Sequence, residues 1–285
     1  MALIHKHRWL GPMLLLAPGL AWLTLFFLVP LGFLGYQSLE SGSFERGFSF
    51  SWAWGNYWDA ISTYHDQLLR SFLYAGLATI AALVISYPLV YWIAFRGGRW
   101  KNLLLLFIVA PFFVTYLIRT LAWQNILADE GPVVGFLRDV HLLAADGRLL
   151  ATTLAVVAGI TYNFLPFMAL PLYVSLEQID PRLLEAAQDL YSSRIQAFLR
   201  VTLPLSAPGV VAGTLLTFIP AAGDFINAQL LGTPKQYMIG NVIQSKFLEL
   251  IDYPAAAALS FVLMATILLA VLVYARVVGT EKLTG

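Results

Sequence analysis

The stretch that decides the fold is residues 71–95, which read SFLYAGLATIAALVISYPLVYWIAF. It contains no charged residue and is longer than the roughly 20 apolar residues that a helix needs to cross a bilayer core of about 30 Å. Apolar and polar positions do not alternate along it, as they would in a strand of a membrane β-barrel. The stretch therefore predicts a transmembrane helix.

Five more segments meet the same test, and the only charge inside them is Arg119. They are residues 10–34, 103–127, 149–176, 201–222 and 254–275. Only 12% of the chain is charged and 59% is hydrophobic, whereas a soluble domain carries about 25% charged residues. We expect an all-α, polytopic membrane protein with six transmembrane helices, forming one domain over residues 1–285.

The charges between these segments predict the orientation of the chain. Ten of the 17 Lys and Arg residues, against five acidic residues, lie on one side: in the N-terminus, the turn after residue 95, the loop after residue 176 and the C-terminus. The other side, with Arg119 included, has seven bases and eleven acids. Because basic loops remain in the cytoplasm, we expect both termini and the loop at residues 177–202 to be cytoplasmic.

Composition also excludes several kinds of chemistry. There is no cysteine, so thiolate metal sites and disulfides are ruled out. Basic and acidic residues nearly cancel, with a net charge of +1, which argues against binding to nucleic acid. No Gly-Lys dipeptide is present, so a phosphate-binding P-loop is missing, and the four histidines show no convincing metal spacing. We expect no catalytic residue, no metal site and no cofactor bound by this chain.

The loop at residues 177–202 is the most informative polar segment. Asp180 is a good N-cap for a helix that starts at Pro181. Apolar residues then recur at helical spacing to Leu190, and Ser192-Ser193 predicts the start of a second short helix. Small side chains at Ala186-Ala187 would let this helix lie close against a groove on a partner. An amphipathic helix resting on the lipid headgroups is the other interpretation of the same pattern.

A family resemblance favours the first interpretation. Glu185-Ala186-Ala187, followed by Leu203-Pro204, resembles the EAA signature of ABC importer permeases. The resemblance implies a type I ABC importer permease fold, in which this loop forms cytoplasmic coupling helices that dock on an ATP-binding subunit. The family's glycine falls at Tyr191 here, so either Tyr191 is strained, at a cost of roughly 1–2 kcal/mol, or the serines make the turn. The residues this assigns to ATPase coupling are Arg182, Leu183, Glu185, Ala186, Ala187, Asp189, Leu190 and Ser192.

Other segments resemble one branch of that family, the spermidine/putrescine permeases. They are residues 111–120, 165–168, 219–225 and 239–243. This resemblance implies a bacterial inner-membrane permease for a small cationic solute of the polyamine type. It also implies the partners: a second permease subunit, two ATP-binding subunits that carry ATP and Mg, and an extracytoplasmic solute-binding protein.

A solute path needs polar side chains at membrane depth. Arg119 in a span costs about 2.5–3.5 kcal/mol on insertion scales, so it should face protein or water. We favour a structural ion pair between Arg119 and Asp224, although Asp224 at the end of the fifth span could instead face a polyamine. Asp129 and Glu130 could form an acidic mouth or a solvated loop. The full set assigned to the path is Asp224, Arg119, Glu130, Tyr116, Trp123 and Asn163, of which the aromatic residues could equally be packing residues.

Three rival functions stay open at this point. An ABC permease for another small solute would share the same signature. A secondary transporter driven by protons or sodium would need acidic residues inside the spans, and the six segments contain none. A membrane scaffold without transport activity would need neither a solute path nor a coupling helix.

Overall fold

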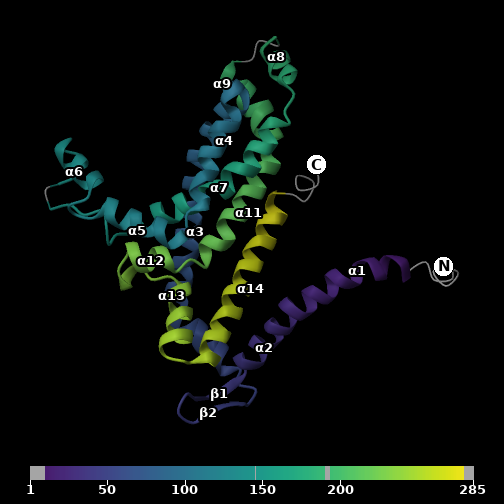
Figure 1. The fold of residues 1–285 in the computed structure, drawn as a ribbon, viewed down its shortest axis with the longest axis vertical. Coiled ribbons are helices and arrows are strands. Elements are labelled where there is room, and N and C mark those ends of the chain that lie inside the picture. Colours follow the sequence, from purple (N-terminus) through teal and green to yellow (C-terminus); the bar gives the residue numbers. More distant parts are fainter. Residues whose placement is uncertain (1–9, 145, 190–192, 279–285) are drawn as a thin grey trace. The chain divides into compact units, whose positions relative to one another are not determined.

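The computed structural model describes residues 10–144, 146–189 and 193–278. In these residues the chain is built almost wholly of helices, with one two-stranded hairpin (Figure 1). Four helices are long and apolar enough to cross a membrane, and there are up to six spans if each of two bent helix pairs counts as one. The fold is therefore the polytopic all-α architecture that the apolar segments predict. Internal contacts divide it into two compact units, Met1–Thr63 with Ile243–Val262, and Tyr64–Val242 with Leu263–Gly285.

The first unit begins with the helical run of the first expected span. Its parts are α1 (Leu10–Leu23), the π-helical turn η1 (Thr24–Leu28) and α2 (Val29–Ser38). Pro30 lies in the first turn of α2 and has no N–H to donate to the backbone hydrogen bonds of the helix. The π-helical turn η1 directly before α2 accommodates the missing hydrogen bond. The side chains of residues 13–30 are exposed and mostly apolar.

The hairpin of the first unit follows α2 directly. Strands β1 (Glu40–Ser43) and β2 (Gly47–Phe50) pair antiparallel, with Glu40 opposite Phe50. The Asn56 side chain donates to the carbonyl oxygens of Ser38 and Glu40, both at 2.9 Å, and so fixes the start of the hairpin. The unit also contains the first turns of α3 (Gly55–Arg96), the π-helical turn η6 (Ser245–Glu249) and the start of α14 (Tyr253–Val278).

The second unit holds the remaining helices. In chain order after α3 they are η2 (Gly98–Trp100), α4 (Lys101–Val109), η3 (Ala110–Phe113), α5 (Tyr116–Leu127), α6 (Pro132–Asp139), α7 (Thr153–Glu177), α8 (Pro181–Asp189), α9 (Arg194–Ala197), η4 (Phe198–Thr202), α10 (Leu203–Leu205), α11 (Ala207–Ala222), α12 (Ile226–Leu231), η5 (Pro234–Gln236) and α13 (Ile239–Gln244), which reaches just past the unit's boundary.

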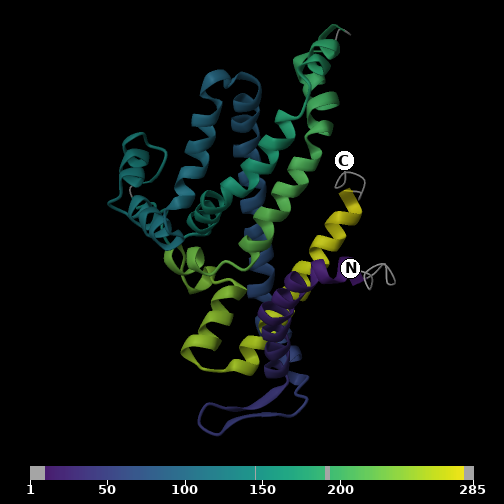
Figure 2. The same ribbon diagram turned by 45° about the vertical axis from the view of Figure 1, so that its right-hand side comes forward.

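Helices α7 and α11 run side by side along much of their length (Figures 1 and 2). Glycines on α11 allow the close approach. A Cβ at Gly209 would lie 2.7 Å from the carbonyl oxygen of Pro171, and one at Gly213 would lie 2.8 Å from the sulfur of Met168. The Gly209 N–H donates to the Ser175 hydroxyl at 3.1 Å. Lipid supplies no hydrophobic driving force for helix association. Small residues stabilise the contact instead, because they let the two backbones pack closely.

Three expected spans differ in detail from the structure. Helix α3 begins at Gly55, well before residue 71, and is kinked at Tyr64 (φ −115°, ψ 19°). The third span is bent by 96° between Phe113 and Tyr116, where the backbone is extended and Pro111 has already interrupted the ladder. The fifth is bent by 62° at Ser206. Two of the six expected spans are thus bent helix pairs rather than continuous helices.

Candidate functional site

The first candidate site is a buried polar cluster around Asp224, which is 7% exposed. One carboxylate oxygen, Oδ1, accepts the backbone N–H of Asn227 at 2.9 Å. The other, Oδ2, accepts from the Asn227 side-chain amide at 3.1 Å and from the Tyr116 hydroxyl. Three donors therefore stabilise the negative charge inside the second unit.

Hydrogen bonds extend this cluster from the α11–α12 connection to α5 and α7. The amide of Asn227, which is fully buried, also donates to the Tyr116 hydroxyl. Asn163 on α7 donates to the side-chain oxygens of Asn227 and Thr120, each at 3.2 Å. The chain of polar contacts fixes α5, α7 and α12 against one another, as a fully connected buried network does.

Arg119 is also buried, at 7% exposure, but it does not belong to this network. The expected ion pair between Arg119 and Asp224 is wrong: no ion pair within 4.0 Å joins them in the described residues. The Asp224 oxygens are occupied by Tyr116 and Asn227 instead. The guanidinium carbon lies 5.7 Å and 5.6 Å from the ring centroids of Phe112 and Tyr116, in cation–π contact.

The polar cluster adjoins a cavity of about 490 Å³ at the bend between α4 and α5. It is lined by Phe112, Phe113, Val114, Thr115, Tyr116, Arg119, Asn163, Phe164 and Phe167. The Asn163 Oδ1 atom is buried and makes no hydrogen bond among the described residues. A cavity with aromatic walls and a few polar groups is suited to a small, partly polar solute.

Two expected path residues lie elsewhere in the second unit. Trp123 packs edge-on against Tyr162, with ring centroids 5.4 Å apart, and lines a separate cavity of about 390 Å³ with mainly apolar walls. Glu130 is exposed in the loop after α5. The structure therefore brings Tyr116, Asn163 and Asp224 into one network with Arg119 beside it, and places Trp123 and Glu130 outside it.

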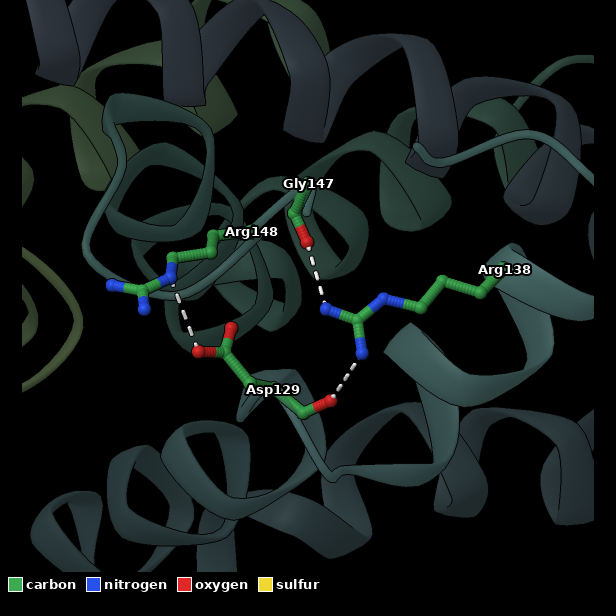
Figure 3. A network of polar contacts seen from close by, with 4 residues as sticks. All are labelled: Asp129, Arg138, Gly147 and Arg148. Atoms are coloured by element: carbon green, nitrogen blue, oxygen red, sulfur yellow. Dashed lines mark hydrogen bonds and ion pairs between the residues drawn. The ribbon is translucent and has the colours of Figure 1, made fainter. Parts of the chain in front are cut away.

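The loop after α5 is organised by two arginines (Figure 3). Arg148 Nε pairs with Asp129 Oδ2 at 3.2 Å, and Arg138 donates to the carbonyl oxygens of Asp129 at 2.9 Å and Gly147 at 3.1 Å. The charge of Asp129 is thus balanced within the loop. Of the two acids expected at a mouth, Glu130 is the one whose charge no ion pair balances in the described residues.

Sequence analysis missed two members of the polar cluster, Asn227 and Thr120. Asn227 had a signal, because it follows Asp224 by three residues and so lies one helical turn away from it. Thr120 had none, since a threonine in a span is ordinarily bonded to its own helix, as its hydroxyl also is here, to the Tyr116 carbonyl at 3.1 Å.

The second candidate site is α8, which carries the EAA signature. The Asp180 carboxylate accepts the Arg182 N–H at 2.9 Å, as the expected N-cap predicts. Exposed side chains along the helix are those of Arg182, Leu183, Glu185, Ala186 and Asp189, while Ala187 is half-buried. Leu190 and Ser192, also assigned to coupling, and Tyr191 lie outside the described residues.

Helix α9, which comes next, is tied to the membrane helices. Ser193 forms a capping box with Gln196, with contacts of 3.2 Å and 3.0 Å, so one serine of the expected pair does cap the second helix. Phe198 then packs edge-on against Tyr87 and Tyr91 of α3, with centroids 5.4 Å and 5.9 Å apart. These contacts join the segment at residues 193–198 to α3.

Residues 60–278 match the family model described as the binding-protein-dependent transport system inner membrane component. This match covers most of the chain, and the chain belongs to that family of membrane-embedded transport components. Members of this family are multi-pass transport components of the inner membrane rather than enzymes, which agrees with the polytopic fold.

Among individual proteins, the chain is similar to the spermidine/putrescine transport system permease protein PotB of Haemophilus influenzae, with 37% identity over 90% of both chains. It is 38% identical to PotB of Escherichia coli over 90% of this chain and 93% of that protein. Its fold is similar to that of a chain in a bacterial alginate ABC transporter in complex with an alginate pentasaccharide-bound periplasmic protein, with a TM-score of 0.71, 19% identity and coverage of 99% and 98%.

Proposed function

We propose that this chain is the membrane-spanning permease subunit of an ATP-driven importer for polyamines such as spermidine and putrescine. The observation that carries the proposal is the 37% identity to a spermidine/putrescine permease along 90% of both chains. An alignment of this length extends over most of the chain rather than over one motif.

In this function α8 is the coupling helix. Its exposed residues, Glu185 and Ala186 among them, would contact an ATP-binding subunit in the cytoplasm. Two copies of that subunit would bind ATP and Mg, and their closure would move α8. The capping box at Ser193 and the packing of Phe198 on α3 would transmit that movement to the spans, because rigid elements couple distant sites.

The solute path is proposed to run past the polar cluster. The aromatic faces of Phe112 and Tyr116 can contact alkylammonium groups, and Asn163 Oδ1 offers a hydrogen-bond acceptor in the cavity. Asp224 adds a negative charge at depth, which favours a cation over an anion. Trp123 and Glu130 would act at other points along the route.

The proposed assembly has four further subunits. A second permease would complete the path, two ATP-binding subunits would drive it, and an extracytoplasmic solute-binding protein would deliver the polyamine. Both termini and α8 would be cytoplasmic, as the distribution of basic residues predicts.

Uptake by the purified complex in proteoliposomes tests the function. We expect radiolabelled spermidine or putrescine to accumulate only with ATP and the solute-binding protein, and an excess of unlabelled polyamine, but not of a neutral sugar, to compete. Accumulation driven by a proton or sodium gradient without ATP, or no polyamine uptake by an assembled complex that hydrolyses ATP, would contradict it.

A further inference from the structure

Arg119 is a buried cation with two guanidinium nitrogens that have no hydrogen-bond partner among the described residues. Its side chain is more than nine-tenths buried, and Nε and Nη1 have no hydrogen-bond partner among the described residues. Buried polar groups in folded proteins are almost always satisfied, because desolvation without a partner is costly. The neighbouring rings of Phe112 and Tyr116 attract the charge, but the Tyr116 hydroxyl is already bonded to Asp224 and Asn227.

Neither of the acceptors considered near Arg119, Asp224 and Asn163, both bonds its N–H groups and balances its positive charge in the described residues. Asp224, the obvious counter-ion, already accepts from Tyr116 and twice from Asn227. Asn163 Oδ1 lines the same cavity without a partner, but a neutral amide leaves the positive charge unbalanced. A carboxylate from outside the chain would both accept the N–H groups and balance the charge.

The surroundings of the cavity indicate where that carboxylate comes from. Its rim is apolar and exposed: Phe113 is 84% exposed, Phe112 47% and Val114 45%. In a membrane span such a surface is covered by lipid tails, by protein or by water of the solute path, and water would accept the N–H groups without balancing the charge. Lipid tails carry no hydrogen-bond acceptor, so they would leave the guanidinium unsatisfied. Coverage by a protein surface that contains a carboxylate satisfies both the apolar rim and the cation.

We propose that Arg119 binds a carboxylate of the second permease subunit, and that the cavity at the α4–α5 bend is a polar contact point between the two membrane subunits. The inference rests on the proposed function only in requiring a second permease. Pairing would also remove an uncompensated positive charge from beside a path for cations, which would otherwise repel the solute.

A charge exchange in the full complex tests this pairing. We expect Arg119→Glu to reduce the amount of second permease that co-purifies by about tenfold, because it places two carboxylates together. Each intramembrane Asp or Glu of the second permease is then replaced by Arg in that background. Recovery to within about twofold of the wild-type amount, at one position only, is the expected result for a direct pair. No recovery at any position, with Arg119→Glu correctly inserted, would overturn the proposal.

Arg148→Glu provides the matched control, because that arginine is 70% exposed and pairs within its own loop. It should leave co-purification unchanged. In that background the Asp or Glu to Arg substitution that rescues Arg119→Glu should lower co-purification, because the new arginine faces the intact Arg119. If Arg148→Glu lowers co-purification as much as Arg119→Glu, the effect is one of general charge and the proposal fails.

A crosslink keeps the proposal testable if Arg119→Glu does not fold. The chain has no cysteine, so Phe113→Cys gives a single thiol on the cavity rim with Arg119 intact. We expect it to form a disulfide with a cysteine introduced one helical turn from the carboxylate of the second permease. Absence of any crosslink across that subunit's spans, in a complex that co-purifies normally, would refute the contact. Co-purification and crosslinking need no transported solute. A complex that transports no polyamine would therefore contradict the proposed function, while the pairing of Arg119 could still be tested.

Discussion

The Tyr116 hydroxyl donates a hydrogen bond to the Asp224 carboxylate, joining α5 to the segment that follows α11. The same hydroxyl accepts from the Asn227 amide, so it lies between the acid and the amide in one short network. Helix α5 follows a 96° bend and lacks a continuous helix to hold its start in place. The network therefore helps to fix α5 in the second unit, together with the packing of Leu127 and Trp123.

Replacing Tyr116 by Phe should therefore destabilise the protein. The variant keeps the ring but leaves Asp224 with one donor fewer, at a cost of about 1–3 kcal/mol. We expect a lower melting temperature of the purified complex. Tyr162→Phe is the control, since that hydroxyl makes no hydrogen bond within the described residues while its ring packs on Trp123. Equal melting temperatures for both variants would show that the hydroxyl of Tyr116 carries no structural role.

The α7–α11 contact should be intolerant of a single added methyl group. In Gly209→Ala the new Cβ would lie 2.7 Å from the Pro171 carbonyl oxygen and 2.9 Å from the Leu172 Cα, so backbone must shift. Overpacking of this kind costs about 1–3 kcal/mol, and we expect a lower melting temperature. Gly76→Ala on α3 meets no atom within 4 Å and should be neutral. A stable Gly209→Ala variant would mean that α7 and α11 are further apart than described.

The two arginines of the loop after α5 should differ in their contribution to stability. Arg148 forms one exposed ion pair, so Arg148→Ala should change the free energy of unfolding by at most about 1 kcal/mol, and less in high salt. Arg138 bonds two backbone carbonyl oxygens, so Arg138→Ala should cost about 1–3 kcal/mol. Limited proteolysis of this loop measures the difference. Faster cleavage in Arg148→Ala than in Arg138→Ala would reverse the assigned roles.

Helix α8 should transmit the energy of ATP hydrolysis. We expect Glu185→Ala to lose most of the solute-stimulated ATPase activity while the complex still assembles, because an exposed contact with the ATP-binding subunit is removed. Glu45→Ala replaces an exposed carboxylate of the hairpin turn and should keep full stimulation. Unchanged stimulation in Glu185→Ala would remove the support for coupling at this residue.

Sequence analysis located the spans because an uncharged run of about 20 residues has few other folded states. It did not locate the bends at residues 114–115 and 206, since the mean hydropathy of a segment is the same whether its helix is straight or bent. Pro111 and Pro208 were the available signals, but Pro166 and Pro171 lie inside the continuous α7, so proline alone does not decide where a span is bent.

The site was predicted in part for a similar reason. Asp224, Tyr116 and Asn163 were identified as polar groups at depth, and they do meet in the structure. Their pairing was not predicted, because charge alone favours Arg119 as the partner of Asp224. The structure instead gives that carboxylate an aromatic hydroxyl and an amide, which satisfy its oxygens, while the guanidinium of Arg119 lies against the rings of Phe112 and Tyr116.

The most direct test of the central claim, that this chain spans the membrane with its α8 helix facing the cytoplasm, is the labelling of single cysteines in intact cells. The cysteine-free chain allows Ala186→Cys on α8 and Leu142→Cys in the loop before α7, both exposed, to be compared with a membrane-impermeant maleimide. We expect Leu142→Cys to react once the reagent has passed the outer membrane, and Ala186→Cys to react only after the inner membrane is permeabilised. Reaction of Ala186→Cys before that step would contradict the claim.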